Sequence, residues 1–371
     1  MDKVTEPIRV AQIMGKMMSG GVESMVMNYY RHINKSKVQF DFIIDEDSTI
    51  VPYDEIERLG GRVFKIPPYQ KAIAYHKSLV KLFRENNYRI VHSHINTLSI
   101  FPLFAAKRAG VQTRIAHSHS TAGKGETMRN ILKYTLRPLS KVFPTHYCAC
   151  SEHAGRWLFG DKLYNQGAVI IVRNAIDLAK FRFDSQTRED VRKELNIKSK
   201  FALVHVGRFM AQKNHSFLID IFEQIQKLDS NSVLFLVGEG ELEQQTRNKV
   251  SQLGLDDHVR FLGVRNDVHR LLMGMDAFLL PSNYEGLGIV AVEAQATQLN
   301  VIASDMVPAE ARISNSIEFI SLNSSPKEWA EVILSYRLEK SKANPIIDYD
   351  YDIENASELL LGIYQATMKG T

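Results

Sequence analysis

Short apolar runs alternate along the whole chain with longer segments in which apolar residues recur at helical spacing. Apolar runs of this length, without regular polar positions, are typical of strands in parallel sheets that are buried on both faces. In the first half we predict strands near residues 8–14, 38–44, 62–66, 89–93, 112–117, 145–149 and 168–172. In the second half we predict them near residues 201–207, 232–237, 258–262, 276–280, 300–304 and 317–320. The alternation predicts an α/β protein whose parallel sheets are covered by helices.

The length of the chain indicates two domains. A chain of 371 residues exceeds one ordinary hydrophobic core. Hydrophobic content of 44% and charged content of 24% are typical of a soluble globular protein, and no apolar run approaches the roughly 20 residues of a membrane span. The polar N-terminus predicts no signal peptide, and the only cysteines, Cys148 and Cys150, form no disulfide framework. We therefore expect a reduced, cytoplasmic setting.

The basic residues gather in the first half of the chain. Residues 1–180 contain 26 Lys and Arg against 15 Asp and Glu, whereas residues 181–371 contain 20 and 27. This asymmetry indicates that the first half faces an anionic partner. Nucleic acid is disfavoured, because the sequence has no recognisable reading motif and no interleaving of aromatic and basic residues. A membrane surface or a lipid-linked phosphate acceptor fits better.

The most informative stretch joins the apolar run Ala277–Leu280 to a predicted helix. Gly286 and Gly288 loosen the loop between them, and Glu285 and Glu293 flank the turn with seven residues between them. A loop that opens a helix presents unpaired N–H groups and the positive end of the helix dipole, which suit phosphates and sugar hydroxyls. The spacing alone leaves open a solvated loop Glu and a chance Glu on the helix.

In its context, Pro-Ser-x-x-Glu-Gly-x-Gly followed by Glu-Ala, this stretch resembles the signature of retaining GT-B glycosyltransferases of family 4. The resemblance implies that Glu285 and the backbone amides of Gly286, Leu287 and Gly288 hold a donor sugar. It also implies that Glu293 accepts hydrogen bonds from the ribose hydroxyls of a sugar nucleotide.

Two cations follow the predicted strand at 201–207. Arg208 and Lys213 lie at its carboxyl end, next to a predicted helix for which Asn214 is a plausible N-cap. Two cations placed there would repel each other unless an anion lies between them, and a pyrophosphate supplies it. The pair resembles the family's Gly-Arg and Gln-Lys motif. A Gly-x-x-x-Asp loop resembles the family's nucleobase site, which implies that backbone groups of Val264 and Arg265 hold the base.

A glycine pair, Gly20 and Gly21, follows the first predicted strand and opens a helix. This layout can cradle a phosphate, but it lacks the full dinucleotide fingerprint, and the residues alone leave a plain tight turn open. Family 4 members carry a similar loop that faces the donor. The resemblance therefore implies that Gly20 and Gly21 belong to the donor site.

Two predicted strands end in His-x-His. His92 and His94 close one, and His117 and His119 close another, at the sheet edge where ligands bind in open α/β sheets. The spacing can also indicate zinc, although it offers no evident third ligand. Family members place a histidine near the anomeric centre at the end of the strand that matches 112–117. The resemblance assigns that role to His119, with His117 as the second choice, to orient and polarise rather than to attack.

A basic stripe is predicted on the helical segment from Met128 to Phe143, where Pro138 is expected to kink the helix or end a turn. The stripe consists of Arg129, Lys133, Arg137 and Lys141. An amphipathic basic helix is typical of contact with a membrane surface, and an ordinary solvated face is the alternative. The basic first half and the family's frequent lipid-linked acceptors favour an anionic membrane, so we expect the protein to be peripheral at the inner face of the cell membrane.

The segment Val169–Asp177 resembles the family's Pro-Asn-Gly-x-Asp linker, with Arg173 replacing Pro and Ala175 replacing Gly. The resemblance implies the GT-B fold, in which two Rossmann-like domains face each other across a cleft and a C-terminal helix crosses back to the first domain. We expect an acceptor-binding domain, a nucleotide-sugar-binding domain and a crossover helix over residues 1–175, 176–350 and 351–371.

Two acidic triplets, Asp45-Glu46-Asp47 and Asp350-Tyr351-Asp352, fit the Asp-x-Asp cation motif of the other large glycosyltransferase fold. Neither lies near the cation pair in the sequence, and such triplets are frequent in loops. We therefore expect no metal and no other cofactor, with Arg208 and Lys213 acting where a divalent ion would.

The resemblance implies a hexosyltransferase that retains anomeric configuration and acts in capsule or exopolysaccharide biosynthesis. The expected donor is a nucleotide diphosphate sugar, most simply a UDP-sugar, and the expected acceptor is lipid-linked or an oligosaccharide. One alternative is a nucleotide-sugar epimerase of similar architecture. Another is a non-catalytic partner of a second transferase.

Overall fold

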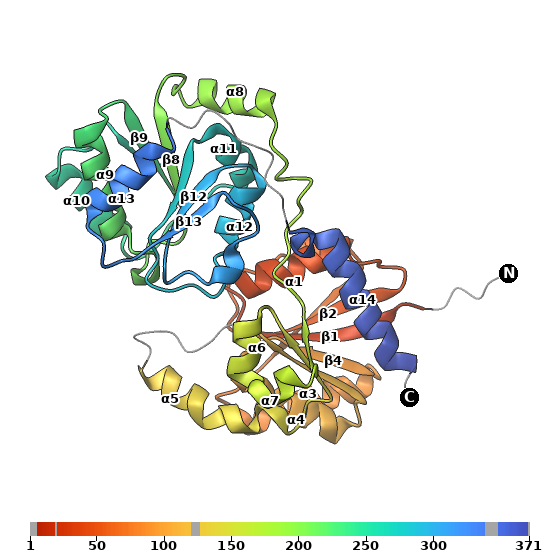
Figure 1. Ribbon diagram of the computed structural model, residues 1–371. Coiled ribbons are helices and arrows are strands. Elements are labelled where there is room, and N and C mark those ends of the chain that lie inside the picture. The colour runs from red at the N-terminus through yellow and green to blue at the C-terminus, as the bar shows by residue number, and fades with distance from the viewer. Residues whose placement is uncertain (1–5, 19–20, 120–126, 338–347, 370–371) are drawn as a thin grey trace. The chain divides into compact units, whose positions relative to one another are not determined.

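The computed structural model describes residues 6–18, 21–119, 127–337 and 348–369. Side chains are described within these ranges except at 127–130 and 369. The chain forms two compact units, Met1–Ala175 together with Tyr349–Thr371, and Ile176–Asp348. Each unit is a parallel sheet with helices on both faces (Figure 1).

The sheet of the first unit has the strand order β3-β2-β1-β4-β5-β6-β7 and is parallel throughout. Its strands are β1 Ile8–Gly15, β2 Val38–Asp45, β3 Arg62–Ile66, β4 Ile90–Ser93, β5 Thr113–Ser118, β6 His146–Ala149 and β7 Val169–Ile171. Its α-helices are α1 Gly21–His32, α2 Tyr53–Arg58, α3 Ala72–Glu85, α4 Ile100–Ala109, α5 Thr127–Leu136, α6 Glu152–Phe159, α7 Asp161–Asn165 and α14 Ile353–Lys369. Short 3-10 helices are η1 Asn96–Ser99, η2 Arg137–Lys141 and η5 Tyr349–Tyr351.

The sheet of the second unit has the order β10-β9-β8-β11-β12-β13, again parallel. Its strands are β8 Phe201–Val206, β9 Ser232–Val237, β10 Val259–Phe261, β11 Ala277–Leu280, β12 Asn300–Ser304 and β13 Ile317–Ile320. Its helices are α8 Ser185–Glu194, α9 His215–Leu228, α10 Glu243–Gln252, α11 Val268–Gly274, α12 Ile289–Ala296 and α13 Pro326–Ser335, with 3-10 turns η3 Ala211–Lys213 and η4 Ala309–Ala311.

Every predicted strand is confirmed, and each end lies within one residue of its expected position. The reason is the burial of both sheet faces: all residues of β9 and β11 are buried, so these strands are uninterrupted apolar runs. Asn214 is the N-cap residue of α9, as expected, but it does not cap the helix through its side chain. Asn214 adopts a left-handed conformation with φ +55° and makes no side-chain cap hydrogen bond.

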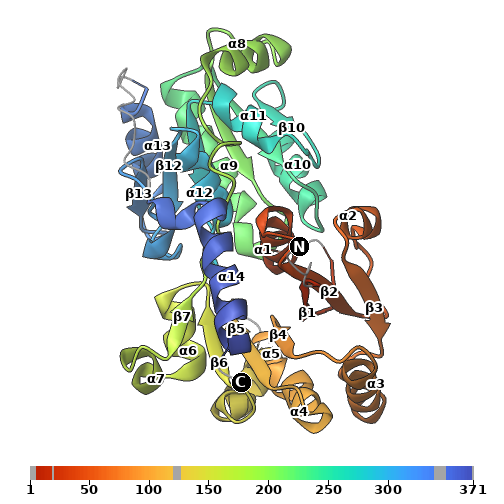
Figure 2. The same ribbon diagram turned by 90° about the vertical axis from the view of Figure 1, so that its right-hand side faces the viewer.

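The C-terminal helix α14 packs on the first unit, as expected. Ile353, Leu360 and Tyr364 belong to the same apolar core as Val10 and Phe40 of β1 and β2. Figures 1 and 2 both show α14 beside α1. The helix therefore completes one face of the first sheet, although some 180 residues separate it in sequence from the rest of that unit.

The strand order in each sheet places the site candidates. The order reverses between β1 and β4 in the first unit and between β8 and β11 in the second. Loops at the carboxyl ends of strands on either side of such a switch point diverge, and ligands bind in the crevice between them. The loops after β8 and β11 contain Arg208, Lys213 and Glu285. The loop after β4 contains His94, and Gly21 is the first residue of the helix that follows β1.

Candidate active site

The loop between β11 and α12 is closed by a left-handed glycine. Gly288 has φ +79° and is the N-cap of α12. A Cβ at this position would lie 3.3 Å from Val307 and would strain the backbone, so glycine permits the sharp entry into the helix. Gly286 is exposed and Leu287 is buried. The N-terminal amides of α12 thus begin at this loop, which is the arrangement that binds anions and hydroxyls.

Glu285 holds this loop to the one after β8. Its side chain is only 6% exposed, and its Oε1 lies 2.6 Å from the Nζ of Lys213. Ser282 donates to the same oxygen at 2.7 Å, and Gln212 donates to Oε2 at 3.1 Å. The backbone N–H of Asn283 donates to the carbonyl of Gln212 at 2.8 Å. The two predicted site residues are therefore brought into contact by neighbouring strands.

This ion pair corrects the electrostatic argument made from the sequence. Arg208 and Lys213 were expected to need an anionic ligand between them, but Glu285 already balances the charge of Lys213. Arg208 lies at the carboxyl end of β8 with its side chain exposed. A Lys ammonium has three N–H donors, so Lys213 retains donors beyond the one directed at Glu285. Glu285 neutralises the charge of Lys213. The remaining positive charge of the site comes from Arg208 and from the N-terminus of α12.

A glycine turn after β9 packs directly beneath the Arg208 loop. A Cβ on Gly238, which has φ +133°, would lie 2.3 Å from the carbonyl oxygen of Gly207. A Cβ on Gly207 would lie 3.0 Å from the Cε of Lys213. The close approach of the two backbones thus requires glycine at position 238, whereas an added Cβ at position 207 would press mainly on the flexible stem of Lys213.

Glu293 lies on α12, one helix turn past the loop. Burial raises the pKa of its carboxyl to about 7, against a smaller lowering by Lys180. Within the described ranges the carboxylate accepts no hydrogen bond and forms no ion pair. A half-buried carboxylate without a partner is costly in the free protein, and hydroxyl donors from a ligand would satisfy it.

The predicted nucleobase loop is a surface turn. The side chain of Val264 is 65% exposed. The guanidinium of Arg265 donates to both oxygens of Asp267, at 2.7 and 2.6 Å. The carbonyl of Gly263 accepts from Gly238 at 2.8 Å, which ties the loop to the glycine turn after β9. The Arg265 side chain is thus engaged within its own loop, and contacts with a base through the backbone stay a prediction.

The glycine pair is described only in part. Gly21 begins α1, is exposed, and would have no heavy atom within 4 Å of an added Cβ. Gly20 lies outside the described residues. Gly21, like His119, belongs to the first unit, so a shared substrate with Lys213 and Glu285 stays a prediction.

The four histidines of β4 and β5 form one buried cluster. Because β4 and β5 are neighbours, their His-x-His ends meet, with His92 Nε2 3.1 Å from His117 Nδ1 and His94 Nδ1 2.9 Å from His119 Nε2. Burial lowers the pKa of His119 to about 3 and keeps the pKa of the other three well below the usual value. All four imidazoles are therefore neutral at pH 7.

The hydrogen bond between Gln12 and His94 determines which ring nitrogen carries the proton in His94 and, through it, in His119. Gln12 Oε1 can only accept, so His94 donates to it from Nε2 at 2.8 Å, and its Nδ1 accepts from Nε2 of His119. The Gln12 amide donates to the hydroxyl of Tyr364 at 3.1 Å, and that hydroxyl lies 2.8 Å from Nδ1 of His92. Nδ1 of His119 is then a bare acceptor, and it is buried without a partner. We assign His119 as a hydrogen-bond acceptor at the end of β5.

The fold also supplies the third metal ligand that the sequence spacing did not offer. One ligand atom each of His92, His94 and His117 lies within 4.8 Å of the others. The hydrogen bonds just given already use one nitrogen or both of each ring, which accounts for the cluster without an ion. The expected absence of a metal requirement stays a prediction.

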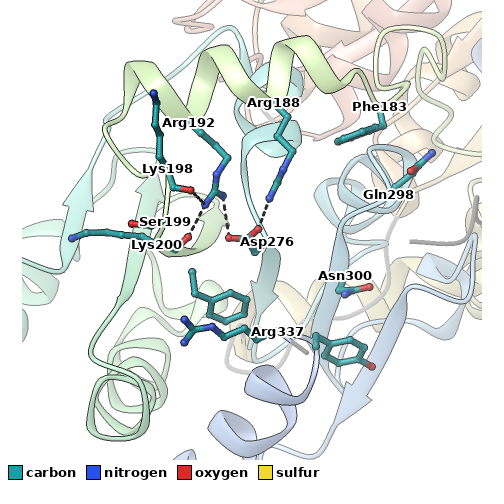
Figure 3. Close-up of a pocket in the computed structure, with 12 residues that line it drawn as sticks. Phe183, Arg188, Arg192, Lys198, Ser199, Lys200, Asp276, Gln298, Asn300 and Arg337 are labelled. Carbon is teal, nitrogen blue, oxygen red and sulfur yellow. Dashed lines mark hydrogen bonds and ion pairs between the residues drawn. The ribbon is translucent and has the colours of Figure 1, made fainter. Parts of the chain in front are cut away.

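A basic pocket at the opposite edge of the second sheet serves structure. It has a volume of about 560 Å³ and lies where β8 and β12 begin, near Phe201 and Asn300 (Figure 3). Arg188 and Arg192 both bond to the carboxylate of Asp276, at 2.5 and 3.1 Å. Arg192 also donates to four backbone carbonyls. These arginines fasten α8 to the sheet, so we do not place substrate there.

The predicted basic stripe lies on α5 and on η2, where Pro138 converts the α-helix into a 3-10 helix. Lys141 is exposed, and the guanidinium of Arg137 lies 5.6 Å from the ring centre of Trp157. The Arg129 side chain lies outside the described residues. Large apolar side chains on the same segment are unusually exposed: Ile131, Leu132, Tyr134, Leu139 and Val142. No helix among the described residues is long and apolar enough to cross a membrane.

Comparisons with known proteins agree with this architecture. The model of the glycosyl transferases group 1 matches residues 187–352, and that of glycosyltransferase family 4 matches residues 19–180. Anabaena HepE, solved in complex with UDP, superposes with a TM-score of 0.76 at 17% identity, covering 98% of this chain and all of that one.

Several curated relatives extend over most of the chain. A putative glycosyltransferase of Bacillus subtilis, EpsF, is 34% identical over 332 residues, which cover 88% of this chain and 86% of that protein. A UDP-Gal:α-D-GlcNAc-diphosphoundecaprenol α-1,3-galactosyltransferase of Escherichia coli is 26% identical over 87% of this chain and 86% of its own length. The capsular polysaccharide biosynthesis glycosyltransferase CapH of Staphylococcus aureus is 25% identical over 97% of this chain and 99% of its own. None of these three is named as an epimerase. With its two Rossmann-like sheets and the matched motifs at their carboxyl edges, the chain belongs to the GT-B glycosyltransferases of family 4.

Proposed function

We propose that this protein is a retaining, metal-independent hexosyltransferase that uses a UDP-sugar and a lipid-linked or oligosaccharide acceptor in surface polysaccharide biosynthesis. The observation that carries the proposal is the buried pair of Lys213 and Glu285, which fixes both loops at the switch point of the second sheet. The UDP complex of HepE and the activity for which the Escherichia coli relative is named support the choice of nucleotide and of a diphosphate lipid acceptor.

The proposed chemistry needs stabilisation of a departing diphosphate. The bond from the anomeric carbon to the diphosphate breaks, a bond to an acceptor hydroxyl forms on the same face, and the hydroxyl proton passes to the diphosphate. Arg208, the remaining N–H donors of Lys213 and the amides that open α12 would bind the growing negative charge. Glu293 would accept hydrogen bonds from the ribose. Arg208, Lys213 and the amides that open α12 would take the place of a divalent ion.

A thermal-shift panel with UDP, GDP, ADP and CMP, each with and without EDTA, tests the donor site. Binding to the native state raises the melting temperature by mass action. We expect a shift with UDP that EDTA does not change and that Glu293→Ala reduces. If only a different nucleotide raises the melting temperature, the donor carries that nucleotide instead of UDP. If none of the four raises it, the enzyme assignment is overturned.

We also propose that α5 and η2 rest on an anionic bilayer. Exposed Leu139 and Val142 next to Lys141 are unfavourable in water and would insert at the headgroup boundary, with the cations facing acidic lipids. Flotation with phosphatidylglycerol vesicles at low salt should recover the protein, and Leu139→Ser with Val142→Ser should reduce the recovery. Absence of flotation at low salt would refute this part of the proposal.

A further inference from the structure

The first unit has a pocket of its own at the carboxyl edge of its sheet. Its volume is about 790 Å³, and the loops after β1, β2, β3 and β4 line it together with α1, α3 and α5. Its walls include Asp45, Tyr69, Gln70 and Tyr75, and it reaches Lys133 on the basic stripe. A pocket at this edge, beside the switch point of β1 and β4, is where an open α/β sheet binds ligand.

Asp45, the last residue of β2, contributes a buried carboxylate to this pocket. The residue is only 7% exposed, yet among the described residues its carboxylate accepts no hydrogen bond and pairs with no cation. Burial is the main cause that raises the pKa of this carboxyl to about 6. Burying a carboxylate without hydrogen-bond partners lowers the stability of the protein, so we expect Asp45 to have a function that offsets this cost.

Asp41, four residues earlier on the same strand, shows how this protein satisfies a structural carboxylate. Asp41 is fully buried, and its oxygens bind Arg9, Arg62 and the hydroxyl of Tyr88. Asp45 has none of these partners and faces a cavity instead. The contrast within one strand indicates that the partner of Asp45 comes from outside the chain.

Tyr75 on α3 supplies the complementary group. It is 3% exposed and lines the same pocket, and within the described ranges its hydroxyl also lacks a hydrogen-bond partner. Asp45 and Tyr75 both line this pocket, and the charge of Asp45 adds to burial in raising the pKa of Tyr75. An unpaired acceptor and an unpaired donor on one wall match a hydroxyl, which donates one hydrogen bond and accepts another.

We infer that Asp45 and Tyr75 bind a ring hydroxyl of the acceptor saccharide, which the hydroxyl achieves by donating to the carboxylate and accepting from the phenol. The inference rests on the proposed function for the identity of the ligand. Lys16 also lines the pocket and pairs with Asp47 at 2.7 Å, which leaves the charges of Asp45 and Glu23 to disfavour an anionic group at this wall. The diphosphate of a lipid-linked acceptor would instead point toward Lys133, at the end of the pocket formed by α5.

Two isosteric variants test the site with a defined probe, N-acetylglucosamine linked through diphosphate to a short polyprenol. Asp45→Asn removes the charge, and Tyr75→Phe removes only the hydroxyl. Each should weaken binding of the probe, measured by calorimetry without donor, by about tenfold, because a charge-assisted or buried hydrogen bond is lost. Affinity for UDP should stay within twofold of the wild type. Glu46→Gln, which alters a neighbouring exposed carboxylate paired with Lys71, is the matched control and should bind the probe normally.

The outcomes separate this inference from the proposed function. Normal probe binding by both variants would mean that water alone occupies the two groups, and would overturn the inference. Wild type that binds UDP but not the probe would overturn it for this class of acceptor while leaving the donor site intact. Failure to bind UDP would refute the proposed donor without changing what the probe measures. A folding defect is excluded if Asp45→Asn keeps its melting temperature at pH 7.5, which we expect because a buried charge is removed.

Discussion

Lys213 and Glu285 form an ion pair that is almost completely withdrawn from water, with side chains 14% and 6% exposed. Removing charges from water is costly, and here Ser282 and Gln212 reduce the cost by donating to the same carboxylate. The pair therefore orders two loops rather than adding much net stability. A ligand that approaches Lys213 meets an ammonium whose position is already fixed, which lowers the cost of organising the site.

Lys213→Met should be strongly destabilising, because it leaves the Glu285 carboxylate buried without its cation. We expect a loss of about 3–5 kcal/mol in the free energy of unfolding, measured by urea denaturation. The double variant Lys213→Met with Glu285→Gln should recover much of this loss while remaining inactive. Equal losses in the single and double variants would contradict the ion-pair interpretation.

Glu293 should make nucleotide binding pH-dependent. Burial raises its pKa to about 7, so the protonated and the ionised carboxyl both occur in the free protein near neutral pH. Ribose hydroxyls favour the ionised acceptor, so binding lowers this pKa and releases a proton. Affinity for UDP should rise by about tenfold between pH 6 and pH 8.

Glu293→Gln is the control for that pH dependence, because it keeps the shape of the side chain and leaves the ionisation of UDP itself unchanged. Calorimetry in two buffers of different ionisation enthalpy measures the released proton. A variant that keeps the full pH dependence of the wild type would show that Glu293 is not the titrating group.

Some residues of the candidate site could be identified from the sequence, although their roles stay predictions, and some of their contacts could not. Glu285, Lys213 and Glu293 could be singled out, because their motif is local and carries a recognisable context. The contact between Lys213 and Glu285 could not, since it depends on which strands are neighbours. The hydrogen bond from Gln12 to Tyr364 joins residues 352 positions apart, and no local sequence pattern predicts it.

At the scale of elements, the glycine turn after β9 sets how closely the site loops approach. Gly238 has both a positive φ and a neighbouring carbonyl oxygen 2.3 Å from its missing Cβ. Gly254 also has a positive φ, +67°, but an added Cβ would meet nothing within 4 Å. The two glycines therefore separate the effect of backbone strain from that of steric contact.

Gly238→Ala should cost about 2–4 kcal/mol in the free energy of unfolding, because strain and a backbone clash add. Gly254→Ala should cost about 1 kcal/mol, from strain alone. Urea denaturation of both variants at the same pH would measure these two losses. Similar losses of unfolding free energy in the two variants would mean that the loops after β8 and β9 can move apart freely. That result would contradict their close packing.

Elements were the most predictable level of this protein. Strands buried on both faces leave uninterrupted apolar runs, so β8, β9 and β11 could be recognised without knowledge of their partners. Helix ends were less certain. Asn214 looks like a capping residue in sequence, but its backbone is left-handed because the chain turns sharply from η3 into α9.

At the scale of the whole molecule, each unit is a parallel sheet with candidate substrate-binding residues at its carboxyl edge. The second unit holds the ion-paired loops, and the first holds the histidine cluster and the pocket of Asp45. Alternation of strands and helices predicted this architecture. The family resemblance implied that the C-terminal helix returns to the first domain, but no pattern in the sequence placed Tyr364 against His92, because that contact depends on tertiary packing.

The anomeric configuration of the product formed with EDTA present would decide whether this protein is a retaining, metal-independent transferase. The protein would be incubated with UDP-glucose or UDP-galactose and the N-acetylglucosamine diphosphate lipid, and the new anomeric centre read by proton NMR. We expect transfer from at least one donor with an α-linked product, no effect of EDTA, and no transfer by Lys213→Ala. A β-linked product, loss of activity in EDTA, or isomerisation of the donor without acceptor would contradict a retaining, metal-independent transferase.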